Sequence, residues 1–266
     1  MLKILVCVKQ VPDVDLVKMD PETGNLVRDG VPSLMNPLDT NALEAAVRVK
    51  EQVGGEVTVI TMGPPAAETV LRESLAVGAD RAVLITGREF GGADTLATSY
   101  VIVKAAQQVD NFDLVFCGKE SLDGATGQMG SQLAERFDFS QVTSMSLVKS
   151  VDEENKKIVV EREVETGLEV IEANIPCLFT VEKTNYPARI PNLKSKLAAK
   201  KAKIITLAPA DIEGLEAGKI GAVGSGTIVP RIYPPVLPEP GQILDEGDLE
   251  ATVAKLCGIL ADNGRL

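Results

Sequence analysis

The sequence predicts an α/β fold with a doubly wound, mainly parallel sheet. Four short apolar runs, typical of buried strands, lie at residues 2–8, 56–62, 81–86 and 112–117. Segments with apolar residues at helical spacing separate them, and such alternation is typical of parallel sheets with right-handed crossovers. Hydrophobic residues make up 45% of the 266 residues, but aromatic residues make up only 3%. Val, Ile, Leu and Ala must therefore build the core, as they do in sheets that helices cover on both faces.

Three helices are predicted between these strands, at residues 36–52, 66–78 and 92–109. Pro37 stands near the start of the first helix, where the missing N–H is tolerated. Gly78 ends the second and is suited to a helix C-cap. Asp94 or Thr95 can cap the N-terminus of the third.

The pattern changes after residue 140. Residues 142–181 contain no long helical stretch, and polar turns at 152–155 and 166–167 separate extended segments. We expect an antiparallel extension that ends in CLFTV at residues 177–181, which would rejoin the main sheet. Residues 214–242 are rich in Gly and Pro, as extended linkers are.

Composition and charge exclude several classes of function. The net charge of −11 argues against nucleic acid as a partner, because phosphate backbones need a basic surface. No apolar stretch approaches the roughly 18 residues that span a membrane, and no signal-peptide pattern is present, so we expect a cytoplasmic protein. The absence of His removes the usual general base and nucleophile systems. The four cysteines lack metal-ligand spacing. We therefore predict no catalytic or metal-binding residue and expect a bound cofactor to supply any chemistry.

A glycine-rich segment at residues 118–137, GKESLDGATGQMGSQLAERF, follows the fourth strand and leads into a helix. Helix N-terminal amides bind anions, and glycine lets a phosphate approach the backbone closely. A tight turn without a ligand would give the same pattern. Further polar loops follow other strands, at residues 7–9, 62–65 and 86–95. Because the carboxyl ends of parallel strands form the ligand crevice, convergence of these loops favours a nucleotide.

Six segments together resemble the beta subunit of electron transfer flavoproteins: LVCVKQVPD (5–13), VRDGVPSLMNPLD (27–39), VGADRAV (77–83), DGATGQMGSQLAE (123–135), VEREVETGLEVIEANIPCLFTV (160–181) and YPARIPNLKSKLAAKKAK (186–203). The resemblance implies an adenine nucleotide alpha-hydrolase-like, Rossmann-like domain that pairs with an alpha subunit carrying FAD. On this basis we expect a nucleotide-binding domain at residues 1–205. Residues 206–266 would form an arm and a C-terminal helix, at 245–260, that docks on the partner subunit.

The resemblance also implies which residues contact the nucleotide: Cys7, Asn36, Pro37, Leu38, Asp39, Met62, Lys119, Asp123, Gly124, Ala125, Thr126, Gly127, Gln128, Met129, Gly130 and Ser131. Gly124, Gly127 and the amides that follow them would hold phosphate. The Thr126 and Ser131 hydroxyls and the Gln128 amide would add donors.

The nucleotide itself is AMP in simpler members of that family and FAD in electron-bifurcating members. GGADTLATSY at residues 91–100 resembles the bifurcating type, in which Thr95 and Thr98 would bind the additional phosphate at a helix N-terminus. Alternatively, Thr95 caps this helix and Thr98 is an ordinary surface residue. FAD is the favoured cofactor. It would take electrons from NADH and bifurcate them to ferredoxin or flavodoxin and, through the alpha-subunit FAD, to an acyl-CoA dehydrogenase.

A partner-docking segment is implied at residues 185–196, NYPARIPNLKSK. In the family, an apolar residue at the position of Ile190, next to Pro191, inserts into the partner dehydrogenase. Ile190 could instead pack beneath its own loop. The lysines that follow, at 194, 196, 200, 201 and 203, suit either a solvated helix face or attraction of an acidic partner. An AMP-binding subunit remains the alternative function, and a nucleotide-sensing stress-type protein is a more remote one.

Overall fold

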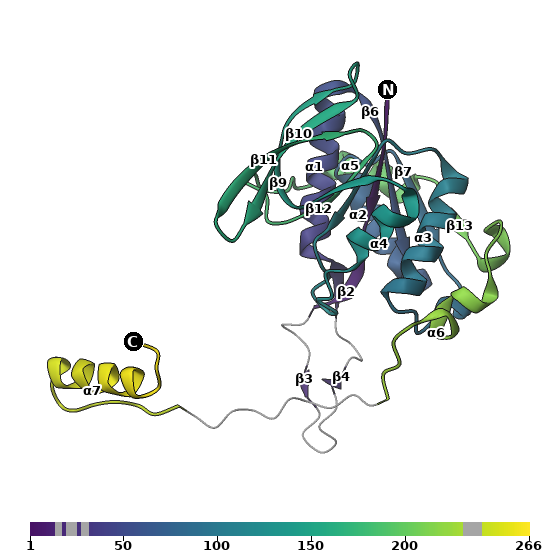
Figure 1. Cartoon of the computed structure of the whole chain (residues 1–266). Coiled ribbons are helices and arrows are strands. Elements are labelled where there is room, and N and C mark those ends of the chain that lie inside the picture. The colour runs from purple at the N-terminus through teal and green to yellow at the C-terminus, as the bar shows by residue number, and fades with distance from the viewer. Residues whose placement is uncertain (14–17, 20–25, 28–31, 231–240) are drawn as a thin grey trace.

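The computed structural model describes residues 1–13, 18–19, 26–27, 32–230 and 241–266 (Figure 1). Residues 28–31 of the family-like segment 27–39 and residues 231–240 of the expected arm therefore lie outside the described residues.

Nine strands of the described chain form one sheet in the order β11-β10-β9-β12-β8-β1-β6-β7-β13. Their bounds are β1 Leu2–Cys7, β6 Gly55–Met62, β7 Arg81–Ile85, β8 Leu114–Gly118, β9 Ser140–Asp152, β10 Lys157–Val164, β11 Gly167–Asn174, β12 Cys177–Val181 and β13 Ile205–Leu207. The pairs from β9 through β13 in this order are parallel, and β10 pairs antiparallel with both β9 and β11. Short strands form two separate two-stranded pairs: β2 Gln10–Pro12 with β5 Ser33–Met35, and β3 Lys18–Met19 with β4 Leu26–Val27.

The helices are α1 Pro37–Val53, α2 Glu68–Ala76, α3 Thr95–Val109, α4 Met129–Phe137, α5 Leu193–Lys201, α6 Gly221–Gly224 and α7 Leu249–Asp262. Short 3-10 turns are η2 Pro65–Ala67, η3 Arg88–Phe90, η4 Pro209–Asp211 and η5 Ala217–Lys219. Among the described residues, none of these helices combines the length and the apolar composition that crossing a membrane requires.

Alternate residues of the central strands face two separate hydrophobic cores, because successive side chains of a strand point to opposite faces. In β1, Ile4 and Val6 pack on the side of α1 and α2, whereas Leu5 and Cys7 pack on the side of α3. The stacked rings of Phe116 and Phe179, 5.1 Å apart, add to the first core. The fold is therefore a three-layer, doubly wound α/β structure, which confirms the predicted class.

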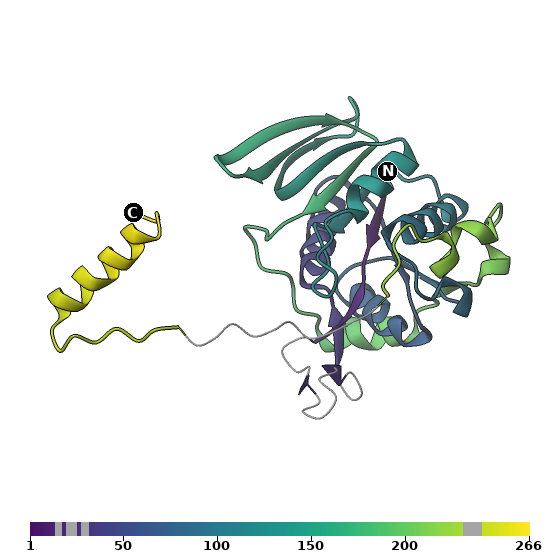
Figure 2. The ribbon, with the colours of Figure 1, turned by 60° about the horizontal axis from the view of Figure 1, so that its bottom comes forward.

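The antiparallel extension is also confirmed. β9, β10 and β11 form one edge of the sheet and are joined by the two predicted turns (Figures 1 and 2). Residues 177–181 return to the sheet as β12, parallel to both β8 and β9. The second predicted helix differs slightly, since it starts as the 3-10 turn η2 and ends at Ala76, two residues before Gly78.

Contacts with the sheet extend beyond residue 205, where we expected the first domain to end. β13 pairs with β7, and Leu207, Ile212 and Ile220 are buried in the core beside α3. Part of the segment expected as an arm, through Ile220, therefore packs on the sheet domain. In α7, by contrast, no residue is buried.

Candidate functional site

A cleft of about 980 Å³ lies at the carboxyl ends of the central strands. The chain runs from β1 outward to β6 and β7, and then returns across the sheet to β8 and β12. The order of strands therefore reverses between β1 and β8, and an open α/β sheet has its ligand crevice at such a point. The four polar loops that we expected to converge, at residues 7–9, 62–65, 86–95 and 118–129, all contribute to the cleft.

Most of the predicted nucleotide contacts line this cleft: Cys7, Asn36, Asp39, Met62, Thr95, Thr98, Lys119, Gly124, Thr126, Gly127, Gln128 and Met129. The remaining predicted contacts lie beside it or behind it: Pro37, Leu38, Asp123, Ala125, Gly130 and Ser131. Gly130 is buried between α4 and β12, where an added Cβ would come within 2.1 Å of the Thr180 methyl group. Close packing of helix on strand is thus sufficient to explain this glycine.

Asn36 organises the glycine-rich loop. Its side-chain amide donates to the Glu120 carbonyl (2.9 Å), and its Oδ1 accepts from the Leu122 amide (3.0 Å). Lys9 Nζ holds the same loop through Asp123 Oδ1 at 2.7 Å. Buried Asn36 is therefore occupied by loop backbone, and it shapes the cleft rather than offering a free donor to it.

Asp39 ties the ends of two strands together at the point where their order reverses. Its Oδ2 accepts from the Lys9 amide (2.8 Å), and its Oδ1 accepts from the Gly118 amide (2.9 Å). Burial raises the pKa of Asp39 to about 6, although hydrogen bonds from Asn36, Gly118 and Lys9 act to lower it. The carboxylate thus replaces the backbone acceptors that β1 and β8 lack at their ends.

The N-termini of α3 and α4 open side by side into the cleft. Asp94 caps α3 by accepting from the Ala97 amide (3.0 Å), so Asp94 and not Thr95 is the N-cap. Thr95 Oγ1 instead donates to Gln128 Oε1 at the start of α4 (2.8 Å). Two adjacent helix N-termini concentrate partial positive charge, which favours an anionic ligand.

Two residues of the loop before α4 have a left-handed backbone conformation, and only one of them is a glycine. Gly127 has φ of 62°, in the left-handed region, and a Cβ added there would meet no atom within 4 Å beyond its chain neighbours. Ala125 also has positive φ, 44°, which costs a non-glycine residue energy. The Ala125 amide donates to the Ser121 carbonyl (2.8 Å), which offsets part of this cost.

Arg88, Phe90 and Thr227 are among the cleft residues that were not singled out from the sequence. Arg88 and Phe90 come from η3, within the loop 86–95 that was predicted to contribute, and Arg88 adds a cation. Thr227 comes from a segment interpreted as linker. Its amide donates to Asp94 Oδ2 (3.0 Å), so the chain after α6 closes the cleft beside α3. Asp94 and Thr227 are 133 residues apart in the sequence, so no local sequence pattern indicates their contact.

Cys7 and Cys117 are neighbours across β1 and β8 and line the cleft floor. Both thiols are buried, and burial raises the pKa of each well above the ordinary value. Since the thiolate is the reactive form, these cysteines act as small apolar residues here.

A smaller hollow of about 600 Å³ lies beside β9 and β10 and shares only Lys119 with the cleft. Three glutamates, Glu163, Glu165 and Glu182, line it and outnumber its two cations, Lys119 and Arg162. Such acidity disfavours a phosphate, so the larger cleft is the better candidate for an anionic nucleotide.

Ile190 lies outside the cleft, on the segment between β12 and α5. Its side chain is 90% exposed, which excludes the alternative that it packs beneath its own loop. Leu193 and Leu197 of α5 are also largely exposed. Pro191 follows Ile190 and precedes Asn192, whose Oδ1 caps α5 by accepting from the Ser195 amide (2.9 Å).

The fold and the cleft define a doubly wound α/β protein with a cleft at the switch point of its sheet, beside two helix N-termini. The Electron transfer flavoprotein domain family matches residues 23–212. The chain is 44% identical to the Electron transfer flavoprotein subunit beta of Thermoanaerobacterium thermosaccharolyticum, covering 96% of both chains. It is 44% identical to the Caffeyl-CoA reductase-Etf complex subunit CarD of Acetobacterium woodii, covering 91% of this chain and 92% of CarD. It is 42% identical to Protein FixA of Azorhizobium caulinodans, covering 88% and 85%.

The chain therefore belongs to the electron transfer flavoprotein family, among its beta subunits and FixA-type relatives. Electron transfer is its class of function.

Proposed function

We propose that this chain is the beta subunit of a heterodimeric electron transfer flavoprotein and that its cleft binds FAD. The observation that carries the proposal is the pair of helix N-termini, α3 and α4, which are joined at the cleft by the bond between Thr95 and Gln128. One helix N-terminus is enough to bind a single phosphate. A dinucleotide carries two phosphates, so two adjacent N-termini suit a dinucleotide better.

The dimensions and charges of the cleft fit FAD. Its volume of about 980 Å³ is at the upper end of the ~300–1,000 Å³ typical of small-molecule sites. Of the cations that line it, Lys9 and Lys119 are paired with Asp123 and Glu182. Arg88 also lines the cleft and would balance phosphate charge. Met62, Phe90 and Ile102 supply apolar walls. A bound flavin would supply the redox chemistry, and the protein would supply binding, orientation and electrostatics.

The relatives support a multisubunit assembly, because their names describe a beta subunit and a member of an Etf complex. We propose an alpha subunit with its own FAD as the obligate partner and a cytoplasmic location. We also propose electron bifurcation, with NADH as the donor. Ferredoxin or flavodoxin would be one acceptor, and an acyl-CoA dehydrogenase, reached through the alpha subunit, the other. Ile190 and Pro191 would dock on that dehydrogenase, since an exposed isoleucine between ordered residues suits an interface anchor.

Cofactor stoichiometry tests the proposal. The chain is co-expressed with the alpha subunit, the heterodimer is denatured, and released FAD and AMP are quantified. We expect two FAD and no AMP per heterodimer. One FAD and one AMP would establish the alternative, a non-bifurcating subunit with structural AMP, and the absence of any nucleotide on this chain would contradict both.

Thr98→Val provides a second readout. We expect loss of one FAD on dilution to be faster by roughly 10- to 100-fold, because a hydrogen bond to a charged group contributes about 1.5–3 kcal/mol. Thr206→Val is the matched control, since Thr206 is exposed on β13 and does not line the cleft. Equal FAD retention in both variants would contradict a role for the N-terminus of α3.

A further inference from the structure

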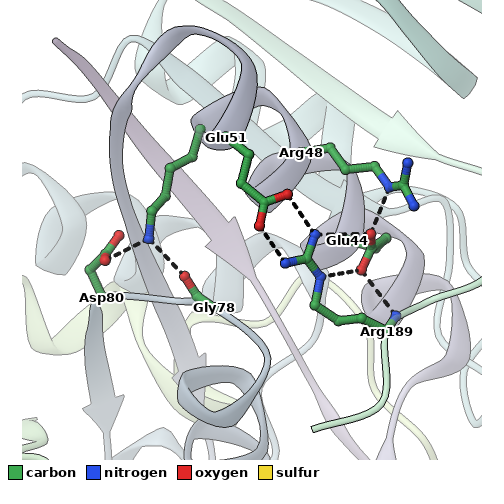
Figure 3. A network of polar contacts seen from close by, with 7 residues as sticks. Glu44, Arg48, Glu51, Gly78, Asp80 and Arg189 are labelled. Atoms are coloured by element: carbon green, nitrogen blue, oxygen red, sulfur yellow. Dashed lines mark hydrogen bonds and ion pairs between the residues drawn. The ribbon is translucent and has the colours of Figure 1, made fainter. Parts of the chain in front are cut away.

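The loop that presents Ile190 is attached to α1 through its neighbour Arg189. Figure 3 shows the Arg189 guanidinium between two carboxylates of that helix, Glu44 and Glu51. Arg189 Nε donates to Glu44 Oε2 (2.8 Å), and Nη1 donates to Glu51 Oε1 (2.6 Å). The backbone amide of Arg189 also donates to Glu44 Oε2 (3.1 Å). The network therefore holds the main chain as well as the side chain.

Glu44 is an unusual anchor because its side chain is only 2% exposed. A buried carboxylate is costly unless it is paired and hydrogen-bonded. Burial acts to raise the pKa of Glu44, but the hydrogen bonds from Arg189 and Arg48 outweigh it and keep the pKa below its ordinary value. Glu44 thus stays ionised, and Arg189 is strongly favoured in its observed position.

The rest of the loop is held on both sides of Ile190. Upstream, the Tyr186 ring lies under the Arg48 guanidinium, 4.1 Å from it, and the Tyr186 carbonyl accepts from Thr184 Oγ1 (2.9 Å). Downstream, Asn192 caps α5. Ile190 itself projects into solvent between these attached residues.

We propose that Glu44 and Glu51 clamp Arg189 so that Ile190 is held outward in the conformation that a partner protein binds, which makes Arg189 a positioning residue of the docking segment. This inference rests on the docking role of Ile190 proposed above. A loop that is already ordered loses less conformational entropy on binding, and this smaller loss strengthens the complex. The expected occupant is a protein surface with an apolar pocket for Ile190 and with acidic groups near the exposed lysines of α5, Lys194, Lys196, Lys200 and Lys201.

The test uses the heterodimer with its alpha subunit and a purified short-chain acyl-CoA dehydrogenase as the probe. Three variants are compared with the parent: Arg189→Met, Glu44→Gln and Ile190→Ala. Arg81→Met is the matched control, because Arg81 has nearly the same side-chain exposure (30% against 31%) and also faces two carboxylates, Glu56 and Asp110. The readouts are KM and kcat for the dehydrogenase, amide hydrogen exchange in residues 185–192, melting temperature and bound nucleotide.

For Arg189→Met we expect faster amide exchange across the loop, an unchanged kcat and a KM raised about tenfold, the scale set by ordering one or two side chains on binding. Glu44→Gln should change both readouts in the same direction but less, because its amide can still accept hydrogen bonds. Ile190→Ala should raise KM without changing amide exchange. The control should change neither.

The outcomes separate the two proposals. If Ile190→Ala raises KM while Arg189→Met leaves KM and exchange as in the parent, the clamp is wrong and the docking role stands. If Arg189→Met speeds exchange without raising KM, the clamp orders the loop but does not position Ile190, and the inference is overturned. If Ile190→Ala leaves KM unchanged, the docking role is wrong and the inference fails with it.

Discussion

At the residue scale, Gly118 and Asp39 show how closely the floor of the cleft is packed. Gly118 ends β8, and its amide donates to Asp39 Oδ1. A Cβ added at Gly118 would lie 2.5 Å from that oxygen and 2.9 Å from Leu38. The position requires glycine because backbone and carboxylate approach each other, and not because of an unusual backbone conformation. The glycine lets one carboxylate hold two strand ends.

Gly118→Ala should therefore lower stability. We expect a loss of about 1–3 kcal/mol, the usual cost of overpacking a dense site, and weaker nucleotide binding because α1 must move away from β8. Denaturant unfolding and nucleotide content measure the two effects. Gly218→Ala is the control, since a Cβ there meets no atom within 4 Å. Equal midpoints for the two variants would show that the floor of the cleft can relax.

The raised pKa of Asp39 predicts that the stability of the fold depends on pH. Burial raises its pKa to about 6, above the roughly 3.9 of an unfolded aspartate. The folded state therefore binds the proton more tightly, and the associated stability is complete below pH ~4 and is lost as pH rises through ~6. The loss approaches about 3 kcal/mol at neutral pH.

Asp39→Asn should remove this slope. Its amide group would face one of the two strand amides, so the variant loses a hydrogen bond but no longer titrates. Unfolding midpoints measured between pH 4 and 7 should fall with pH in the parent and stay flatter in the variant. Parallel curves would mean that Asp39 does not carry the raised pKa.

At the element scale, strands and helices with strong patterns were predicted to within a few residues. The run 2–8 became β1 and the run 56–62 became β6, because a fully apolar run in a buried parallel strand leaves little choice of position. The cleft followed from the same logic, since polar loops after parallel strands must meet. β13, in contrast, has only three residues. Its pairing with β7 depends on tertiary contacts, which the spacing of hydrophobic residues in the segment does not indicate.

Two contacts between residues distant in the sequence could also not be predicted from the sequence pattern. Thr227 reaches Asp94 across 133 residues, and Arg189 reaches Glu44 across 145. A charge on a helix usually indicates a solvated face, and Glu44 would be read in that way from its position in α1. Glu44 is instead buried, and it accepts hydrogen bonds from Arg189 in an irregular loop.

At the scale of the whole molecule, α1 connects the cleft with the proposed docking segment. Asn36 and Asp39 at its start shape the floor and the glycine-rich loop, and Glu44 and Glu51 farther along hold Arg189. A single helix thus contacts both the cleft and the loop that carries Ile190. For an electron carrier this matters, because the separation between donor and acceptor depends on where the partner docks.

The last prediction concerns how much of the C-terminal part belongs to the sheet domain. Ending the chain after Pro230 removes α7, which buries no side chain, so the melting temperature of the chain should change little while binding of the alpha subunit is lost.

Ending it after Lys203 also removes Leu207, Ile212 and Ile220 from the core. Each buried apolar side chain contributes about 1.5–3 kcal/mol, so the melting temperature should fall by roughly 10 °C or more. Thermal unfolding and gel filtration with the alpha subunit measure both. A large drop for the first truncation would place α7 against its own domain, and an unchanged melting temperature for the second would restore a boundary at residue 205.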